Sequence, residues 1–269
     1  SVPGIKPNAL KKKIKKTGFE DQMMTEGEAF HFWAIEAPVY VRRELPLDKI
    51  GLNVIYTDDL SPYRIRKLRI LNGAHTLMVP VGYLYGFETV RETVEHDVSG
   101  KFVERALFDE IIMTMAFPEN ELLVYAKAVL ERFKNPFINH HLTSIALNSV
   151  SKFRFRVLPS ILAFYEKKGE VPVCLVFSMA ALVHFYKGEY EGGKTPLNDS
   201  AEVIAHLQNL WKKCNRSDAA FTKLAEKILQ WEAVWGRDLT SVSGFSSLLG
   251  YYLYKIEKDG MQKALRELA

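Results

Sequence analysis

The stretch Ser61-Pro-Tyr-Arg-Ile-Arg-Lys-Leu-Arg-Ile-Leu-Asn-Gly-Ala-His-Thr76 is where the sequence changes from a mixed to a helical pattern. Pro62 suits the first turn of a helix, because a donor is not needed there. An amphipathic pattern continues to about Tyr85, and Pro80 within it predicts a kink. Upstream, residues 1–58 combine turns with two short extended segments, 31–36 and 52–56. A helical domain is therefore predicted to begin near residue 59.

The remaining sequence predicts a series of further helices. The segment Pro172–Tyr186 is apolar on nearly all sides, which is typical of a central buried helix. The other predicted helices cover residues 88–94, 101–115, 119–133, 139–150, 159–169, 199–213, 217–235 and 261–269. The predicted fold is mainly α, with a short mixed α/β segment at the N-terminus.

Composition and charge limit the possible classes of function. Of 269 residues, 48% are hydrophobic and 25% charged, which indicates a globular protein. The net charge of +4 comes largely from the lysine-rich run 11–16, so nucleic-acid binding is not expected. The longest uncharged stretches, 171–186 and 239–254, are shorter than the roughly 20 residues of a membrane-spanning helix. We therefore expect neither a nucleic-acid nor a membrane partner.

The cysteines and histidines give little sign of a disulfide or a metal site. Cys174 and Cys214 do not form a paired motif, and no secretory signal is visible, so a reducing, cytoplasmic location is expected. The adjacent residues His140 and His141 would point in different directions on a helix. Glu202 and His206 share a helix face but lack a third ligand. No metal is expected.

Residues 188–195, Gly-Glu-Tyr-Glu-Gly-Gly-Lys-Thr, match the phosphate-loop pattern G-x-x-x-x-G-K-[ST]. The match lies after a helix-like run rather than a strand, and Pro196 follows it directly. Glu189 and Glu191 would also place negative charge where a phosphate binds. We therefore interpret the segment as a flexible loop, with nucleotide binding as a minor alternative.

The opening stretch also carries side chains suited to proton transfer. On an α-helix, Lys67, Asn72 and His75 would lie within an arc of roughly 140°, with Arg64 in the same arc. A partly desolvated lysine among like charges has a lowered pKa and can act as a general acid or base. Asn72 could donate to a developing alkoxide, and His75 could hold a substrate hydroxyl. The alternative is a solvated basic helix face with no catalytic role.

The run Lys67-Leu-Arg-Ile-Leu-Asn72-Gly-Ala-His75 resembles the K-x4-N-x2-H signature of the polyol-specific long-chain dehydrogenases, the mannitol dehydrogenase family. Segments 132–136, 145–152 and 157–160 extend the resemblance over most of the chain. It implies a helical substrate domain, residues 59–269, with a fold like the C-terminal domain of 6-phosphogluconate dehydrogenase. It also implies that Lys67 is the general acid/base, that Asn72 polarises the reacting carbonyl and that His75 positions the substrate. Lys152 matches a second lysine of the substrate pocket.

One departure from the family pattern concerns the substrate. Polyol dehydrogenases of the family carry an Arg eight residues before the second lysine and an Asp-Gly-Ser before it, whereas this chain has Ser144 and Asn148-Ser149-Val150. The departure favours the hexuronate branch. Arg154 and Arg156, with Arg64 or Arg66, could hold a sugar carboxylate. The alternative for these arginines is surface solvation.

A second departure concerns the cofactor. Members of the family carry an N-terminal dinucleotide-binding domain, but no G-x-G-x-x-G follows a strand in this chain. The resemblance thus implies that residues 1–58 are the tail of such a domain, which would bind NAD mainly outside this chain. The expected function is reduction of a keto-hexuronate, a small sugar acid, to an aldonate by NADH. The alternatives are a fructuronate- or mannitol-type enzyme of the same family and a non-catalytic helical interaction module.

Overall fold

A computed structural model describes residues 14–18, 21, 23–24 and 30–268 of the chain. The chain divides into two compact units, Ser1–Tyr63 and Arg64–Ala269. The boundary lies five residues after the one expected from the sequence. Residues 1–13, which include half of the lysine-rich run 11–16 and part of the predicted mixed segment, lie outside the described residues.

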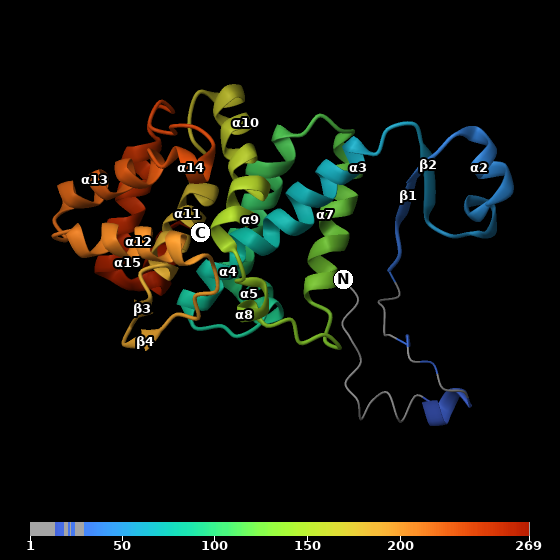
Figure 1. The fold of residues 1–269 in the computed structure, drawn as a ribbon, viewed down its shortest axis with the longest axis horizontal. Coiled ribbons are helices and arrows are strands. Elements are labelled where there is room, and N and C mark those ends of the chain that lie inside the picture. Colours follow the sequence, from blue (N-terminus) through green and yellow to red (C-terminus); the bar gives the residue numbers. More distant parts are fainter. Residues whose placement is uncertain (1–13, 19–20, 22, 25–29, 269) are drawn as a thin grey trace. The chain divides into compact units, whose positions relative to one another are not determined.

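The first unit contains a parallel pair of strands (Figure 1). Strand β1 (Trp33–Glu36) pairs with β2 (Val54–Thr57), with Trp33 opposite Val54. Parallel neighbours require a crossover connection. Here it contains helix α2 (Val39–Glu44) and the 3-10 turn η1 (Leu47–Ile50). The two extended segments predicted from the sequence are confirmed, and their parallel pairing is typical of sheets in α/β proteins.

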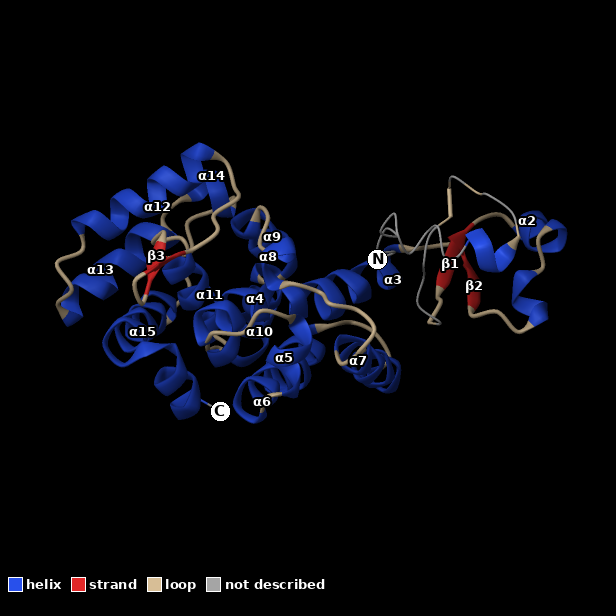
Figure 2. Ribbon diagram, turned by 90° about the horizontal axis from the view of Figure 1, so that it is seen from below, coloured by secondary structure: helices blue, strands red, loops and turns tan. Residues whose placement is uncertain are grey.

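The second unit is built of helices, so the prediction of a mainly α fold is confirmed (Figure 2). Two of its segments, η2 and η3, are π-helical, and η4 is a 3-10 turn. Helix α3 begins in the first unit and ends in the second. The elements are α3 (Ser61–Arg66), η2 (Lys67–Asn72), α4 (Gly73–Tyr85), α5 (Val90–Glu95), α6 (Asp97–Arg105), η3 (Ala106–Ile111), η4 (Ile112–Thr114), α7 (Glu119–Phe133), α8 (Leu142–Ile145), α9 (Ser149–Arg156), α10 (Leu158–Lys168), α11 (Val173–Phe185), α12 (Ala201–Lys213), α13 (Asp218–Leu229), α14 (Glu232–Trp235) and α15 (Phe245–Leu268).

Helix α11 is the buried centre of this unit, as its all-round apolar sequence predicts. It packs against α4 and α15 (Figure 1). Ser178 Oγ donates to the carbonyl oxygen of Leu77 in α4 at 2.8 Å. At the N-terminus of α11, the buried carboxylate of Glu110 accepts hydrogen bonds from the N–H groups of Cys174 and Leu175, at 2.8 and 2.9 Å. The carboxylate thus satisfies donors that the first turn of a helix leaves open.

Several predicted helix boundaries are wrong. Segment 139–150 is not one helix. It contains α8 and the first residues of α9, and Asn148, with a left-handed φ of 51°, precedes the first residue of α9. Segment 217–235 divides into α13 and α14. Gly260 has non-helical φ and ψ and divides α15 into two helices, so the predicted short helix from Met261 is confirmed as its last part, whereas the helix that starts at Phe245 was not predicted. Helix α4 contains Pro80 and continues to Tyr85, and the π-turn η2 lies upstream of it.

Residues 188–195 form a β-hairpin rather than a phosphate loop or a flexible loop. Strand β3 (Glu189–Tyr190) pairs antiparallel with β4 (Gly193–Lys194). The two turn residues, Glu191 and Gly192, have φ of 47° and 81°, as a two-residue hairpin with its favoured twist requires. None of the helices in the described chain is long and apolar enough to cross a membrane.

Candidate active site

The signature Lys67…Asn72…His75 lies where the long α3–η2–α4 helix changes its winding. Lys67 begins and Asn72 ends the π-helical turn η2, and His75 follows in the first turn of α4. In an α-helix, Lys67 and Asn72 would differ by about 140° in direction. The wider π-turn, with bonds from i to i+5, brings residues five apart closer to one direction. Such π-turns within α-helices are frequent at functional sites.

Asn72 offers a polar side chain at the end of this turn. Its backbone carbonyl accepts the hydroxyl of Thr76 at 2.9 Å, which fixes the backbone at this position. The side chain is partly exposed, and its amide makes no hydrogen bond to any residue that the structure describes. The amide is therefore available to donate to an oxygen atom of a ligand.

His75 is held in a nearly apolar environment. Its ring lies 4.4 Å from the ring of Phe133 and 5.0 Å from that of His140, measured between centroids. Burial, with smaller contributions from His140 and Arg156, lowers the pKa of His75 to about 3. The imidazole is thus neutral near pH 7 and has both a donor and an acceptor nitrogen. Its Nε2 is buried without a hydrogen-bond partner among the described residues, so it can bind a hydroxyl group.

Helix α9 brings Arg156 to this region. A side chain at Gly73 would place its Cβ 3.3 Å from the carbonyl oxygen of Arg156, so the glycine permits the close approach of α9. Arg156 Nη1 lies 3.4 Å from the hydroxyl oxygen of Thr76, one residue after His75. Burial lowers the pKa of Arg156, and the group stays charged because its ordinary pKa is far above neutrality.

Lys152 lies one helical turn before Arg156, on the same face of α9. Its Nζ donates to the carbonyl oxygen of Ile145 at 2.8 Å. Burial and the charge of Arg156 lower the pKa of Lys152, while Asp199 opposes that shift. Lys152 and Arg156 therefore place two cations on the same side of α9.

Arg154 points elsewhere. Its guanidinium stacks over the ring of Phe155 at 5.0 Å and lies 2.6 Å from the place where a Cβ of Gly236 would be. It therefore packs against the turn that ends α14, on the opposite side of α9 from Lys152 and Arg156. The structure does not bring the predicted pair Arg154 and Arg156 together.

The four cations near the signature do not form one basic face. Arg66 is buried, with its guanidinium 4.6 Å from the ring of Tyr125 and 5.1 Å from that of Phe117, both on the α7 side. An oxygen of Glu121 lies 3.7 Å from its Nη1. Arg66 therefore anchors the helix to α7, and its proposed part in a carboxylate clamp is not supported by its position.

Arg69 is also turned inward. Its Nη1 donates to Ser160 Oγ at 2.9 Å, and burial lowers its pKa to about 10. Lys67 and Arg64 are exposed. We expected Lys67 to be partly desolvated, but its side chain is exposed in this chain. Arg66 and Arg69, rather than Lys67, point inward from this part of the helix.

Sequence reasoning missed the residues that surround His75. The sequence predicts Phe133 only as the end of a helix and offers His140 only as a metal ligand, whereas both rings lie against His75. His206, another candidate ligand, stacks on Trp231 at 3.8 Å. The described residues contain no group of three or more His, Cys, Asp or Glu side chains arranged to hold a metal ion.

Comparison with known proteins identifies the family. The mannitol dehydrogenase C-terminal domain matches residues 59–256. The chain belongs to this family. The resemblance drawn from the K-x4-N-x2-H signature is thereby confirmed.

Relatives in the mannitol dehydrogenase family cover nearly the whole chain. Altronate oxidoreductase of Yersinia pestis is 42% identical over 248 residues, which are 92% of this chain and 51% of that protein. Altronate oxidoreductase of Phocaeicola vulgatus is 39% identical over 267 residues, 98% of this chain and 55% of that protein. The chain thus spans about half the length of the curated relatives that it matches.

Solved structures of the same fold are more distant in sequence. The ternary complex of Pseudomonas fluorescens mannitol 2-dehydrogenase with NAD and D-mannitol has a TM-score of 0.78 at 21% identity, over 100% of this chain and 52% of that one. A substrate-free D-sorbitol dehydrogenase has a TM-score of 0.73 at 21% identity, over 98% of this chain and 52% of that one. These matches show that the chain has the fold of this helical domain.

Proposed function

We propose that this chain is the substrate-binding and catalytic part of an NAD-dependent tagaturonate reductase, also called altronate oxidoreductase. The enzyme would reduce a keto-hexuronate to an aldonate. The observation that carries the proposal is the π-turn that begins with Lys67 and ends with Asn72, followed by His75, whose buried Nε2 has no hydrogen-bond partner among the described residues. The altronate oxidoreductases that are about 40% identical to the chain over the aligned half of their length support the same activity.

Each signature residue has a chemical role in this proposal. Lys67 donates a proton to the substrate oxygen as the carbonyl is reduced, and accepts it in the reverse direction. Asn72 donates an amide N–H to the same oxygen while negative charge develops on it. His75, neutral because of its burial, positions the substrate through a hydroxyl group. Because Lys67 is exposed in this chain, its desolvation must come from the bound substrate and the remainder of the enzyme.

The described residues do not fit the pyrophosphate of a dinucleotide. Such a site needs a glycine-rich turn between a strand and the N-terminus of a helix, and the one glycine-rich match forms the β3–β4 hairpin. We therefore assign NAD binding to an N-terminal dinucleotide-binding domain of the same protein, with residues 1–58 as its tail. NADH would supply the hydride. The NAD named with the mannitol 2-dehydrogenase structure supports this cofactor.

The substrate carboxylate provides a test within the proposed site. Arg156 lies beside Thr76 in the site, whereas Arg154 packs against the end of α14. We expect Arg156→Met to raise KM for the keto-hexuronate by about 10- to 150-fold, the effect of a lost charge-assisted contact, and to change KM for a neutral keto-hexose much less. Arg154→Met is the matched control. Equal effects of both variants on both sugars would remove Arg156 from carboxylate binding.

The activity is tested with the full-length protein. Oxidation of NADH is followed with tagaturonate, fructuronate and fructose as substrates. The proposal predicts the highest kcat/KM with tagaturonate. A preference for fructuronate or for the neutral sugar would assign the protein to a fructuronate- or mannitol-type activity. No turnover of any of them would favour a non-catalytic interaction module.

A further inference from the structure

A basic pocket of about 390 Å³ lies in the second unit and shares no residue with the candidate active site. It is lined by the end of α11, the β3–β4 hairpin, α12 and the loop that follows α12. Four of its lining residues are cations, Lys187, Lys194, Lys212 and Arg216, and one, Glu189, is an acid. The pocket contains the Gly188 and Lys194 positions of the sequence motif that matched a phosphate loop without forming one.

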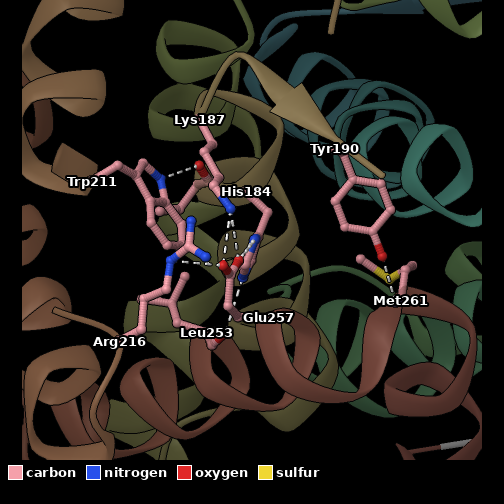
Figure 3. A network of polar contacts seen from close by, with 9 residues as sticks. His184, Lys187, Tyr190, Trp211, Arg216, Leu253, Glu257 and Met261 are labelled. Atoms are coloured by element: carbon pink, nitrogen blue, oxygen red, sulfur yellow. Dashed lines mark hydrogen bonds and ion pairs between the residues drawn. The ribbon is translucent and has the colours of Figure 1, made fainter. Parts of the chain in front are cut away.

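A network of polar contacts links two of the four cations, Lys187 and Arg216, to α15 (Figure 3). The carboxylate of Glu257 on α15 accepts two hydrogen bonds from Lys187 Nζ, at 2.9 and 3.0 Å. Arg216 Nε lies 3.4 Å from the same carboxylate. One carboxylate is therefore shared by two cations, and it compensates only one of their two charges.

The neighbouring histidine adds no charge to this network. His184 is completely buried, and burial lowers its pKa to about 4, so it is neutral near pH 7. Its Nε2 lies 3.0 Å from the carbonyl oxygen of Leu253, which can only accept, so the ring proton is on Nε2. Nδ1 is then a bare nitrogen 3.7 Å from Glu257 and cannot donate to it. The carboxylate thus depends on Lys187 and Arg216 for its partners.

The other two cations of the pocket have one acid between them, Glu189, which lies opposite Lys194 in the β3–β4 pair. Lys194 on β4 and Lys212 on α12 are exposed, and neither forms an ion pair with any residue in the described part of the chain. Glu189 and Glu257 oppose four positive charges, which leaves an excess of two. A pocket with two excess positive charges attracts a doubly charged anion more strongly than a single carboxylate.

The backbone around the pocket is shaped for close contact. Gly188 has φ of 93°, a left-handed conformation that favours glycine, and Nε2 of Gln208 lies 2.5 Å from the place where a Cβ would be. The Gln208 side chain makes no hydrogen bond with the residues described, which leaves its amide free to donate into the pocket. Arg216 holds a left-handed φ of 63°, a conformation that non-glycine residues rarely adopt outside functional or tightly constrained positions.

We propose that this pocket binds the phosphate group of a small molecule. A phosphate monoester carries about −1.5 to −2 charges at pH 7, which matches the excess in the pocket. Lysines bind phosphate as point charges, so Lys194 and Lys212 are its direct partners. Gln208 donates to a phosphate or sugar oxygen, and Trp211 forms the apolar floor beside it. This site is independent of the reductase activity proposed above.

Calorimetric titration of the full-length protein with inorganic phosphate, glucose 6-phosphate and gluconate, at constant ionic strength, tests the proposal. We expect phosphate binding in the millimolar range or tighter, weakened about two- to fivefold by Lys194→Met and by Lys212→Met, the effect of one exposed charge. Lys223→Met, an exposed lysine on α13, is the matched control and should change nothing. Reductase activity should be the same in all three variants.

The outcomes are distinct. Tighter binding of glucose 6-phosphate than of phosphate would identify a phosphorylated metabolite as the ligand, and equal binding would identify free phosphate. Both support the site if Lys194→Met and Lys212→Met weaken them. The proposal is overturned if phosphate does not bind below 10 mM, a threshold of about 2.7 kcal/mol, if gluconate binds more tightly than phosphate, or if the control variant weakens binding as much as the pocket variants.

Discussion

Neighbouring cations in the signature helix have opposite environments. Arg66 and Arg69 are directed into the protein. Arg66 stacks on aromatic rings, and Arg69 donates a hydrogen bond to Ser160. Lys67 lies between them in sequence and is exposed. On a helix, residues three apart share a face, as Arg66 and Arg69 do, whereas Lys67 between them points to another side, so a cluster of charges in the sequence separates into anchoring and accessible groups. Only Lys67 and Arg64 of the four remain available to a substrate.

Replacement of Lys67 tests its proposed role. In the full-length enzyme we expect Lys67→Ala to lower kcat by at least about 100-fold, because a positioned general acid contributes about that much. Binding of NADH should stay nearly unchanged. Steady-state kinetics and a cofactor titration measure the two effects. Lys223→Ala on α13 is the control, and turnover of Lys67→Ala close to that of the control would show that Lys67 is not the proton donor.

Because His184 is buried, we expect the folded protein to lose stability in acid. The pKa of His184 is about 4 in the folded protein, below the ordinary value of 6.5, because burial disfavours the charged form. The unfolded chain therefore binds more protons between these values, and stability falls as the pH drops from about 6.5 to 4. By pH 5 this site alone should lower the free energy of unfolding by about 2 kcal/mol relative to pH 7.5.

Urea unfolding of wild type and His184→Gln at pH 7.5 and pH 5 measures this contribution. The variant should lose about 2 kcal/mol less than the wild type over this interval, since glutamine does not titrate. His141→Gln, which changes an exposed histidine, should behave as the wild type. An identical pH dependence in His184→Gln and wild type would show that His184 does not titrate in this range.

At the scale of elements, the helices of the second unit are joined by close backbone approaches. Gly250 lies in α15, where a Cβ would be 2.8 Å from the Cα and 3.0 Å from the backbone nitrogen of Thr222 in α13. Since both contacts are to backbone atoms, the helices themselves would have to move apart to admit a side chain. The glycine therefore sets the distance between α13 and α15.

The variant Gly250→Ala has two opposite effects on stability, a gain in helix propensity and a loss from overpacking between α13 and α15. Alanine favours an isolated helix by about 0.8–1.0 kcal/mol over glycine. Overpacking against α13 costs about 1–3 kcal/mol, so we expect net destabilisation, measured by urea unfolding. Gly193→Ala is the control, because its Cβ would meet nothing closer than 3.5 Å. An increase in stability of Gly250→Ala would mean that α13 and α15 are not held this closely.

At the scale of the whole molecule, the helical unit carries the family signature. The described residues of the first unit contribute one parallel strand pair and no glycine-rich phosphate turn. Parallel strands are usually found in sheets covered on both faces. The large side chains of Trp33 and Ile50 are nevertheless exposed, with 55% and 67% of their surface accessible. These features agree with our proposal that a preceding domain completes the first unit.

Cofactor binding tests the proposal that a preceding domain binds NAD. We expect residues 1–269 alone to bind NADH more weakly than about 1 mM, a free energy of about −4 kcal/mol, because the pyrophosphate finds no helix N-terminus behind a glycine turn. The full-length protein should bind at least about tenfold more tightly. Fluorescence titration of NADH with both proteins measures the difference. Micromolar binding by residues 1–269 would refute the assignment of the cofactor to the preceding domain.

The sequence alone determined the helical character, the buried helix α11 and the family signature. These follow from local properties: apolar residues around Val173–Phe185, capping and breaking residues, and a motif of fixed spacing. The tertiary structure decided the π-turn at Lys67–Asn72, the neutral state of His75 and the opposite directions of Arg154 and Arg156. Each depends on partners distant in sequence, such as Phe133 beside His75 and Gly236 beside Arg154. Hydrophobic periodicity records which face of a helix is buried, but it does not record which side chains of other helices cover that face.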